Sequence, residues 1–453
     1  MNVPKLEKAL GIEVYASTAI GVGGKIRQFP EDFTVEEVLT DCSRAQISPA
    51  KSVSVSGRGR YLLCVLVKRN WDTFLAVKAV AKKLGVSSER IRIAGIKDAK
   101  AVTAQHFSIY GIVPEHVSNV KIKDITVYPL RFSNEKIHSN LLLGNHFRIQ
   151  IRAIAHSPST IGERLKKVQG QLQSVGGLPN FFGHQRFGTV RPITHIVGRC
   201  LVRGELEEAA LCFLAQYSEH EHPESREARQ RLLRTQNFRE ALSIFPRKLQ
   251  HERVMLVHLA KRRRDFAGAF RRLPLKLRQL FVQAYQSHLF NRFLSRRMRQ
   301  GISLNEPQTG DYVVNLYNNG LPTADFTQVT SNSLEDIKQA SNKGEVRIAL
   351  PIIGFKQPTS SGVQGEIERE ILETENVAPS DFHVGHMSEI GAPGRLRTAL
   401  TPIANFFIEG PIKDQAYPSK RTVSLNFTLQ KGSYATVLLR EFLKPRDPIE
   451  AGF

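Results

Sequence analysis

The stretch Phe147-Arg-Ile-Gln-Ile-Arg-Ala153 alternates apolar with polar side chains, the pattern of a β-strand that buries one face. The same alternation returns near the other end of the chain in Val423-Ser-Leu-Asn-Phe-Thr-Leu429. Between the two stretches, residues 205–299 carry a mostly helical pattern. A separate tail of about 60 residues would bury only a marginal core. We therefore expect the tail to join the first part in one α+β domain that carries a large insertion.

Other segments fit this organisation. A helix is predicted over residues 72–84, with Asp72 as its N-cap and Gly85 just past its end. The clearest helix of the middle part begins at Pro274 and ends before Gly301. Further strands of the first part are predicted at residues 25–29, 33–39, 61–67, 91–94 and 104–110. We expect a discontinuous sheet domain of residues 1–205 and 390–453, and an inserted, mainly helical α/β domain of residues 206–389.

The charge balance indicates a polyanionic partner. The 453 residues include 64 Lys and Arg against 42 Asp and Glu, a net charge of +22. RNA, DNA and an anionic membrane surface are the candidate partners. The chain has no apolar run of about 18 residues, and its first ten residues lack the apolar core of a signal peptide. We expect neither a transmembrane helix nor secretion.

The four cysteines do not form a recognisable framework. Cys42, Cys64, Cys200 and Cys212 are widely spaced, and none belongs to a CxxC pair. This usage predicts a reducing, intracellular compartment and no structural zinc. His383 and His386 are three residues apart and lack a third ligand nearby, so solvated or capping roles are favoured over metal binding.

One glycine-rich stretch resembles a phosphate-binding loop. Gly21-Val-Gly-Gly-Lys25 has Ala19 where the GxxxxGK pattern needs glycine, and Ile26 where it needs Ser or Thr. The sequence therefore does not predict a nucleotide-binding loop here.

Positive charge is concentrated in residues 247–299. This segment has fifteen Lys or Arg and only two acids, Glu252 and Asp265. Its densest run is Lys261-Arg262-Arg263-Arg264. Most charge runs are solvated helical faces. Because opposite charges are almost missing along this segment, we favour a surface that contacts RNA phosphates.

Gly95-Ile-Lys-Asp-Ala-Lys-Ala-Val-Thr-Ala-Gln105 places Asp98 on a polar connection between two predicted strands. Lys97 and Lys100 stand beside it, and a carboxylate near cations is held in the ionised form that a nucleophile or base needs. The alternative is a turn aspartate that caps its own loop. From spacing alone the two interpretations are about equal.

A second candidate site is Asn180-Phe-Phe-Gly-His-Gln-Arg-Phe-Gly188. Adjacent aromatic rings, an amide and an arginine on a loop suit stacking and hydrogen bonding to an unstacked base. The alternative is an aromatic loop anchored in the core, and for Phe181 or Phe187 singly this alternative is favoured.

These segments resemble the TruD family of pseudouridine synthases. Residues 95–105 are similar to the family signature, and residues 180–188 to its second motif, which usually has Tyr at the place of Phe181. Lys25-Ile-Arg-Gln-Phe-Pro-Glu-Asp-Phe-Thr-Val-Glu-Glu37, Gln283-Ala-Tyr-Gln-Ser-His-Leu-Phe-Asn291 and the segment from Gly432 to Glu441 resemble three further motifs in the expected order.

The resemblance implies a mixed, largely antiparallel sheet flanked by helices, the pseudouridine synthase catalytic fold, interrupted by a family-specific insertion. It implies an isomerase without cofactor or metal that converts a uridine of tRNA, typically uridine 13, to pseudouridine. A monomer in the cytoplasm is expected, with tRNA in the cleft between two lobes.

Individual residues match the family's motifs. Asp98 matches the catalytic aspartate, a nucleophile, and Phe182 the aromatic residue that stacks on the base. Asn180 lies beside that site, Arg186 is expected to bind substrate with it, and Lys97 matches a motif lysine without an assigned role. The residues alone leave open whether Asp98 attacks the sugar, attacks the base or abstracts a proton.

Two other functions remain open at this point. A non-catalytic RNA-binding or assembly factor would suit the composition equally, although an intact Asp98 favours an enzyme. A synthase of the same family acting on another RNA, such as rRNA, would differ mainly in shape contacts of the inserted domain. An RNA hydrolase is disfavoured, because the sequence has no evident cluster of metal-binding carboxylates.

Overall fold

An eight-stranded sheet combines strands from both ends of the chain. The computed structural model describes residues 2–48, 55 and 57–453. The pairing of β1 with β4 is parallel and the other pairings of this sheet are antiparallel, as predicted. In spatial order the strands are β13 (Ile403–Lys413), β14 (Arg421–Gln430), β6 (Leu142–Ile154), β1 (Phe33–Leu39), β4 (Val102–Tyr110), β2 (Tyr61–Arg69) and β5 (Ile125–Ser133), with β3 (Ile91–Ile93) pairing with β4.

The alternating stretches lie side by side in this sheet. β6 pairs with β14, so the predicted union of the tail with the first part is confirmed. Phe147, Ile149 and Ile151 are buried as expected, but the alternation ends before Ala153. Ala153 has a φ of 59° at a register shift against β14, and Ile154 is buried in its place. An extra residue in one strand reverses which side chains face the core.

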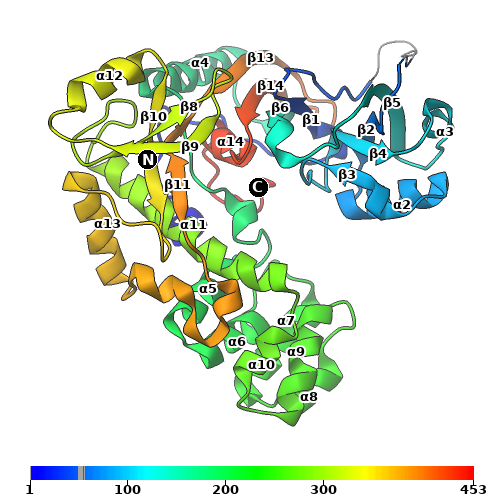
Figure 1. Ribbon diagram of the computed structural model, residues 1–453, viewed down its shortest axis with the longest axis vertical. Helices are drawn as coiled ribbons and strands as arrows, with labels where there is room; N and C mark the ends of the chain where they lie inside the picture. The colour runs from blue at the N-terminus through cyan, green and yellow to red at the C-terminus, as the bar shows by residue number, and fades with distance from the viewer. Residues whose placement is uncertain (1, 49–54, 56) are drawn as a thin grey trace.

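Helices pack against the same face of the sheet near its two ends (Figure 1). α2 (Thr73–Leu84) packs against β2 and β4, and begins as predicted where the Asp72 carboxylate accepts the backbone N–H groups of Phe74 and Leu75. Near the other end of the sheet lie α4 (Pro158–Val175) and α14 (Ala435–Leu443). Residues 25–29, predicted as a strand, form only one isolated bridge, between Lys25 and Arg152.

The middle of the chain builds a helical lobe and a second sheet. Figure 1 shows α6–α10 at the far end of this lobe, with α11 running back from it towards the second sheet. The helices are α5 (Thr194–Arg203), α6 (Leu206–Ala215), α7 (Pro223–Thr235), α8 (Phe238–Ile244), α9 (Gln250–Lys261), α10 (Phe266–Arg271) and α11 (Leu275–Arg299). The second sheet has the order β11 (Arg395–Thr398), β10 (Val346–Ile352), β8 (Tyr312–Leu316) and β9 (Pro322–Gln328). It thus includes a strand from the segment after residue 390.

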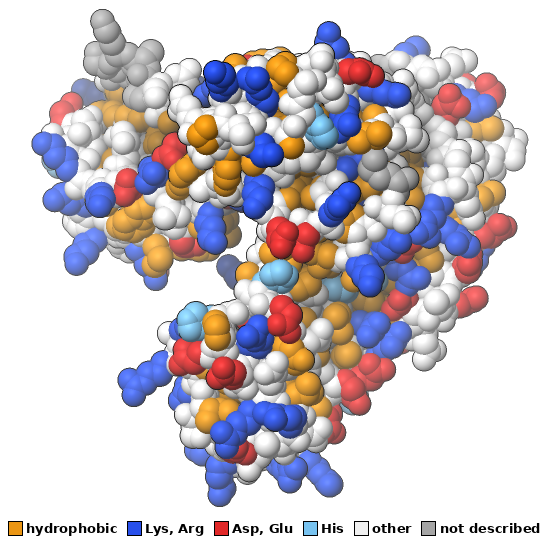
Figure 2. Space-filling view, turned by 180° about the vertical axis from the view of Figure 1, so that it is seen from behind, with side chains coloured by type: hydrophobic (Ala, Val, Ile, Leu, Met, Phe, Trp, Pro, Cys, Tyr) orange, Lys and Arg blue, Asp and Glu red, His pale blue; other side chains and the backbone are white. Residues whose placement is uncertain are grey.

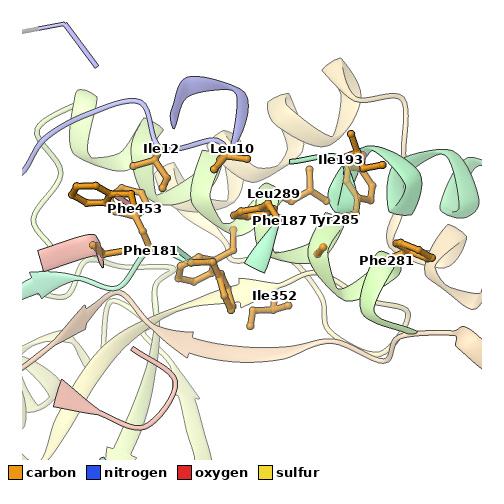
Figure 3. Close-up of a cluster of buried hydrophobic side chains, with 14 of the residues drawn as sticks. Leu10, Ile12, Phe181, Phe187, Ile193, Phe281, Tyr285, Leu289, Ile352 and Phe453 are labelled. Carbon is orange, nitrogen blue, oxygen red and sulfur yellow. The ribbon is translucent and has the colours of Figure 1, made fainter. Parts of the chain in front are cut away.

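One hydrophobic core joins the two parts (Figure 3). Phe281, Tyr285 and Leu289 of α11 pack in the same cluster as Phe181 and Phe453. The N-terminal segment contributes Leu10 and Ile12 to it. This shared core positions residues 180–188 between the sheet domain and α11. Among the described residues, no helix is both long and apolar enough to cross a membrane.

Candidate active site

Asp98 lies on the loop between β3 and β4, and this loop is fixed through its backbone. The Lys68 ammonium donates to the backbone carbonyls of Asp98, at 2.6 Å, and of Trp71, at 2.8 Å. The Thr73 hydroxyl donates to the Lys97 carbonyl and accepts from its N–H, each at 3.2 Å. Desolvation of the buried Lys68 lowers its pKa to about 8. The loop is therefore held firmly while the side chain of Asp98 remains 37% exposed.

The carboxylate of Asp98 is oriented by Arg27. One guanidinium nitrogen of Arg27 donates to Asp98 Oδ1 at 3.1 Å, and the other to the carbonyl of Gly452 at 3.3 Å. The guanidinium also lies over the Phe33 ring, 4.1 Å from its centroid. Burial lowers the pKa of Arg27, and Asp98 counteracts that shift. In the described part of the chain the Asp98 carboxylate accepts no hydrogen bond from its own loop, so the loop-capping interpretation lacks support.

The cations next to Asp98 in sequence are not its partners. Lys97 is buried, and its Nζ lies 2.6 Å from Oε2 of Glu37 on β1. His106 of β4 approaches the other oxygen of this carboxylate at 3.3 Å. Desolvation raises the pKa of Glu37. The hydrogen bonds from His106 and Lys97 outweigh this effect, so the pKa lies below its ordinary value. Lys100 is exposed. Lys97 thus reaches inward to Glu37, while the side chain of Asp98 remains partly exposed.

Arg27 is the functional candidate that reasoning from the residues missed. It is 71 positions from Asp98 in the sequence. Its only signal was its place in the segment 25–37, which resembles the family's N-terminal motif.

The loop of residues 180–188 is buried along most of its length. Phe181 and Phe187 are core residues, as expected for each singly. The Asn180 side chain is enclosed as well: its Nδ2 donates to the Thr398 carbonyl at 3.2 Å and to the Thr398 hydroxyl at 3.1 Å. Arg397 donates to Asn180 Oδ1 at 2.6 Å. Asn180 thus ties the loop to β11.

Phe182 lines a cavity of about 370 Å³ between this loop, α11 and residues 390–395. Its backbone N–H and carbonyl both bond to the side-chain amide of Asn291, at 2.8 and 3.0 Å. The Arg397 guanidinium lies 4.2 Å from the ring centroid, and the ring of Phe290 meets it edge-on at 5.5 Å. The Phe182 side chain is accordingly only 5% exposed.

Arg186 faces the same cavity. It donates to the Ser287 hydroxyl at 3.1 Å and to Gln283 Oε1 at 3.3 Å, both on α11. Gln279 and Gln286 add two further amides to the lining. An aromatic ring surrounded by amides and a guanidinium is suited to holding a planar, hydrogen-bonding group such as a nucleobase.

The C-terminal residues connect Asp98 with the Phe182 loop. Arg27 binds the carbonyl of Gly452, and the ring of the next residue, Phe453, meets His184 edge-on at 5.7 Å. Burial lowers the pKa of His184 to about 4, so this ring is neutral at physiological pH. Among the residues that the structure describes, Asp98 and Phe182 share no contact, and the cavity beside Phe182 is not lined by Asp98. Figure 2 shows the surface hollowed between the lobe with α2 and the lobe with α7–α10.

Many of the positive charges of the basic segment 247–299 are paired with acids that lie outside the segment in the sequence but close to it in the fold. Arg297 is fully buried and forms two bonds with Asp311, at 2.6 and 2.8 Å. Other cations of the segment that pair with acids outside it are Lys248, Arg271, Arg278, Arg292, Arg296 and Arg299. The run of residues 261–264 differs, because all four side chains are exposed at the end of α9 and in the turn that leads to α10. Figure 2 shows Lys and Arg gathered at this end of the molecule.

Comparisons with known proteins agree with one another over nearly the whole chain. A family profile described as tRNA pseudouridine synthase D (TruD) matches residues 9–442. A relative from Methanosarcina barkeri, named "Probable tRNA pseudouridine synthase D", is 38% identical over 99% of this chain and 100% of its own. A relative of the same name from Thermococcus sibiricus is 35% identical over 95% of this chain and 97% of its own.

The fold has a counterpart among solved structures. The crystal structure of a TruD protein from Methanosarcina mazei superposes with a TM-score of 0.84 at 37% identity, covering 98% of this chain and 99% of that one. The predicted fold class, a pseudouridine synthase sheet with a large insertion, is confirmed by this match. Because the profile, the relatives and the solved structure all agree, the chain belongs to the TruD family of tRNA pseudouridine synthases.

Proposed function

We propose that the protein converts uridine 13 of tRNA to pseudouridine, with Asp98 as the catalytic nucleophile. The observation that carries this proposal is the presentation of Asp98: its loop is fixed by Lys68, its carboxylate is oriented by Arg27, and its side chain is still 37% exposed. A nucleophile needs both orientation and access, and this carboxylate has both.

The reaction exchanges one bond to the sugar for another. The bond between N1 of uracil and C1′ of ribose breaks, the base turns, and C5 bonds to C1′. C5 loses a proton and N1 gains one, so neither redox change nor hydrolysis is involved. A carboxylate can form a covalent intermediate with the sugar or the base while the base turns. The target nucleotide is stacked in folded RNA and has to be flipped out before Asp98 can reach it.

Other residues would hold the substrate. We assign Phe182 to stacking on the base, which is supported by its place in a cavity rich in amides. Asn180 and Arg186 would shape that cavity, and Lys97 would act through its ion pair with Glu37 on the geometry of the Asp98 loop. Exposed cations at residues 261–264 would contact RNA phosphates. We expect a monomer that works in the cytoplasm without metal or nucleotide cofactor.

The experiment that tests this function is incubation of the purified protein with an unmodified tRNA transcript, followed by pseudouridine mapping at single-nucleotide resolution. The expected result is stoichiometric conversion at position 13 in wild type and none with Asp98→Asn. A transcript with cytidine at position 13 is the matched control and should remain unmodified at every position. Pseudouridine found only at other positions, or only in rRNA fragments, would contradict the assignment of uridine 13 of tRNA as the substrate.

Absence of pseudouridine in every RNA, combined with tight RNA binding, would support a non-catalytic RNA-binding or assembly factor. The geometry favours the enzyme over that factor. A binding protein has no use for an accessible carboxylate that its own fold orients, because the carboxylate repels phosphate.

A further inference from the structure

A second basic site lies where the two ends of the chain meet. A cavity of about 940 Å³ is enclosed by the first turn of the chain around α1 (Lys5–Ala9), the stretch 20–25 and the segment 443–451 that follows α14. It shares no lining residue with the cavity beside Phe182. Neither Asp98 nor Arg27 lines it.

The lining is dominated by positive side chains. The cations of the cavity are Lys5, Lys8, Lys25, Arg164, Lys444 and Arg446. Asp447 and Glu450 are its acids, and Asp447 is engaged in accepting the backbone N–H groups of Ile449 and Glu450. Within residues 2–48, 55 and 57–453, no cation of this cavity forms an ion pair with either acid. With six cations against two acids, the lining therefore carries a net positive charge in the free protein.

Two of these cations are fixed by the protein itself. Arg164 donates to the carbonyl of Gly21 at 2.9 Å, and the ammonium of Lys444 donates to the carbonyl of Ser17. Desolvation lowers the pKa of Lys444 to about 8, and the nearby Glu441 offsets only part of that shift. Lys5, Lys8, Lys25 and Arg446 are exposed instead, and in the described chain they form neither side-chain hydrogen bonds nor ion pairs.

The glycine-rich stretch forms one wall of the cavity but not as a phosphate loop. The backbone N–H groups of Val22, Gly23 and Lys25 donate to the carbonyls of Phe442, Leu443 and Arg152 and are not free for a ligand. The glycines serve close packing. A Cβ at Gly21 would lie 2.4 Å from the Leu443 carbonyl oxygen, and one at Gly24 would lie 2.7 Å from that of Arg152. Binding in this cavity must therefore come from side chains.

We propose that this cavity is a binding site for phosphate groups. Lysine and arginine side chains converging from four segments, on a concave surface and in excess over its two acids, match the charge of a phosphodiester or a free polyphosphate. The cavity also borders the active site along the chain: Lys25 is two residues from Arg27, and Ala451 precedes Gly452, whose carbonyl binds Arg27. A phosphate here would lie beside the groups that orient Asp98. If the phosphate belongs to the RNA backbone, the proposal rests on the proposed function, since it requires a bound RNA.

The test is a variant in which Lys5, Lys8, Lys25 and Arg446 are all replaced by Gln. Because these side chains are exposed and form no hydrogen bonds or ion pairs in the described structure, the melting temperature should stay unchanged. RNA affinity is measured against salt concentration. If two phosphates occupy the cavity, the slope of log K against log[salt] should flatten by about 1.5. A matched control replaces the exposed Lys82, Lys83, Lys121 and Lys123 by Gln, which removes the same charge elsewhere.

A second arm measures inorganic pyrophosphate binding by calorimetry. A flattened slope with no pyrophosphate binding would identify the RNA backbone as the source of the phosphate. Pyrophosphate binding to wild type, lost in the variant with the salt slope unchanged, would identify a free phosphate compound. An unchanged slope with unchanged or absent pyrophosphate binding would overturn the proposal. So would an equal change in the control variant, because net charge would then explain the effect.

If the fourfold variant melts at a lower temperature, Lys25→Gln and Arg446→Gln are measured singly, and each should flatten the slope by about 0.7. Binding is read out directly, so the outcome is separate from catalysis. A wild-type protein that binds RNA yet makes no pseudouridine would contradict the proposed function and leave this test intact.

Discussion

The two loops expected to meet the target uridine are built on opposite principles. The Asp98 loop is held by charge: Lys68 fixes its backbone and Arg27 its carboxylate, and the side chain stays accessible. The 180–188 loop is held by burial, with Phe181 and Phe187 in the core and Phe182 only 5% exposed.

The difference predicts how each loop responds to mutation. Replacing the partly exposed carboxylate of Asp98 by an amide of the same shape leaves packing intact, because the amide oxygen can still accept the hydrogen bond from Arg27. Removing a buried ring leaves a cavity, with a cost in stability of several kcal/mol. Chemistry and folding should therefore separate cleanly at Asp98 and overlap at Phe182.

The largest expected effect is that of Asp98→Asn on turnover. Asn is nearly isosteric but cannot act as an anionic nucleophile or base, so the rate should fall by several orders of magnitude, on the order of 4 kcal/mol or more of barrier. Melting temperature and tRNA affinity should shift little, because the side chain is partly exposed and, among the described residues, is hydrogen-bonded only to Arg27. Single-turnover pseudouridine formation, thermal melting and tRNA binding on the same preparation are the measurements.

Asp124→Asn is the matched control for this variant. Asp124 also faces an arginine, Arg69 at 3.9 Å, and its side chain is 35% exposed. This control should keep full turnover. Near-normal turnover of Asp98→Asn would contradict the catalytic role of Asp98. Loss of folding together with activity would support the loop-capping role instead.

The next effect is expected at Phe182, where both stability and activity should suffer. Phe182→Ala should destabilise the fold by about 3–4 kcal/mol, because the ring is enclosed by Arg397 and Phe290. Phe182→Leu restores most of the apolar volume without a π-face, and Phe182→Tyr keeps the π-face. Thermal melting and turnover of the folded fraction are measured for all three.

The stacking assignment predicts that Tyr retains substantial activity while Leu, although folded, does not. Phe181→Ala provides the comparison on the same loop: it should lower the melting temperature and leave the turnover of folded protein nearly normal. If Leu restored both stability and turnover, Phe182 would be a core residue only.

Local signals in the sequence predicted local structure well. Asp72 caps its helix and Gly85 ends it in a left-handed conformation, because capping depends only on adjacent residues. The alternation in residues 147–151 and 423–429 located two strands that pair in the sheet. It failed at Ala153, where a bulge depends on the neighbouring strand and on Asp414, whose carboxylate accepts the Ala153 N–H at 2.8 Å.

Local signals could not predict contacts between residues that are distant in the sequence. Nothing in the residues themselves joins Arg27 to Asp98, and adjacency suggested Lys97, which in fact pairs with Glu37. The sequence of the basic segment 247–299 likewise gave no sign that its cations are paired. The acids that pair with them, such as Asp311, belong to other elements. The proposed site chemistry rests on motifs, whereas the pairing of charges required the fold.

A smaller effect is expected at Arg27. Replacing it by Gln removes the charged hydrogen bond to Asp98, worth about 1.5–3 kcal/mol, so turnover should fall roughly 10- to 100-fold. Arg27→Lys keeps the charge, but a single ammonium group cannot bond to both Asp98 and the Gly452 carbonyl as the guanidinium does. This variant should therefore recover only part of the rate. Single-turnover rates are compared with those of Arg131→Gln, an exposed arginine that pairs with Asp41 on the same sheet domain. Equal rates for all variants would mean that Asp98 needs no partner.

The smallest effect on turnover belongs to the exposed cations of residues 261–264. Replacing all four by Gln should flatten the slope of log K for tRNA against log[salt] by roughly 3–4, if each contacts a phosphate. At saturating tRNA the rate should hardly change, because phosphate contacts position the RNA without taking part in the reaction. Folding should survive, since all four side chains are exposed and only Arg262 is near an acid, Asp265 at 3.9 Å. An unchanged slope in a well-folded variant would remove this end of the helical lobe from the interface. The cavity between the chain ends would then be the basic surface still to be tested for holding RNA against the Asp98 loop.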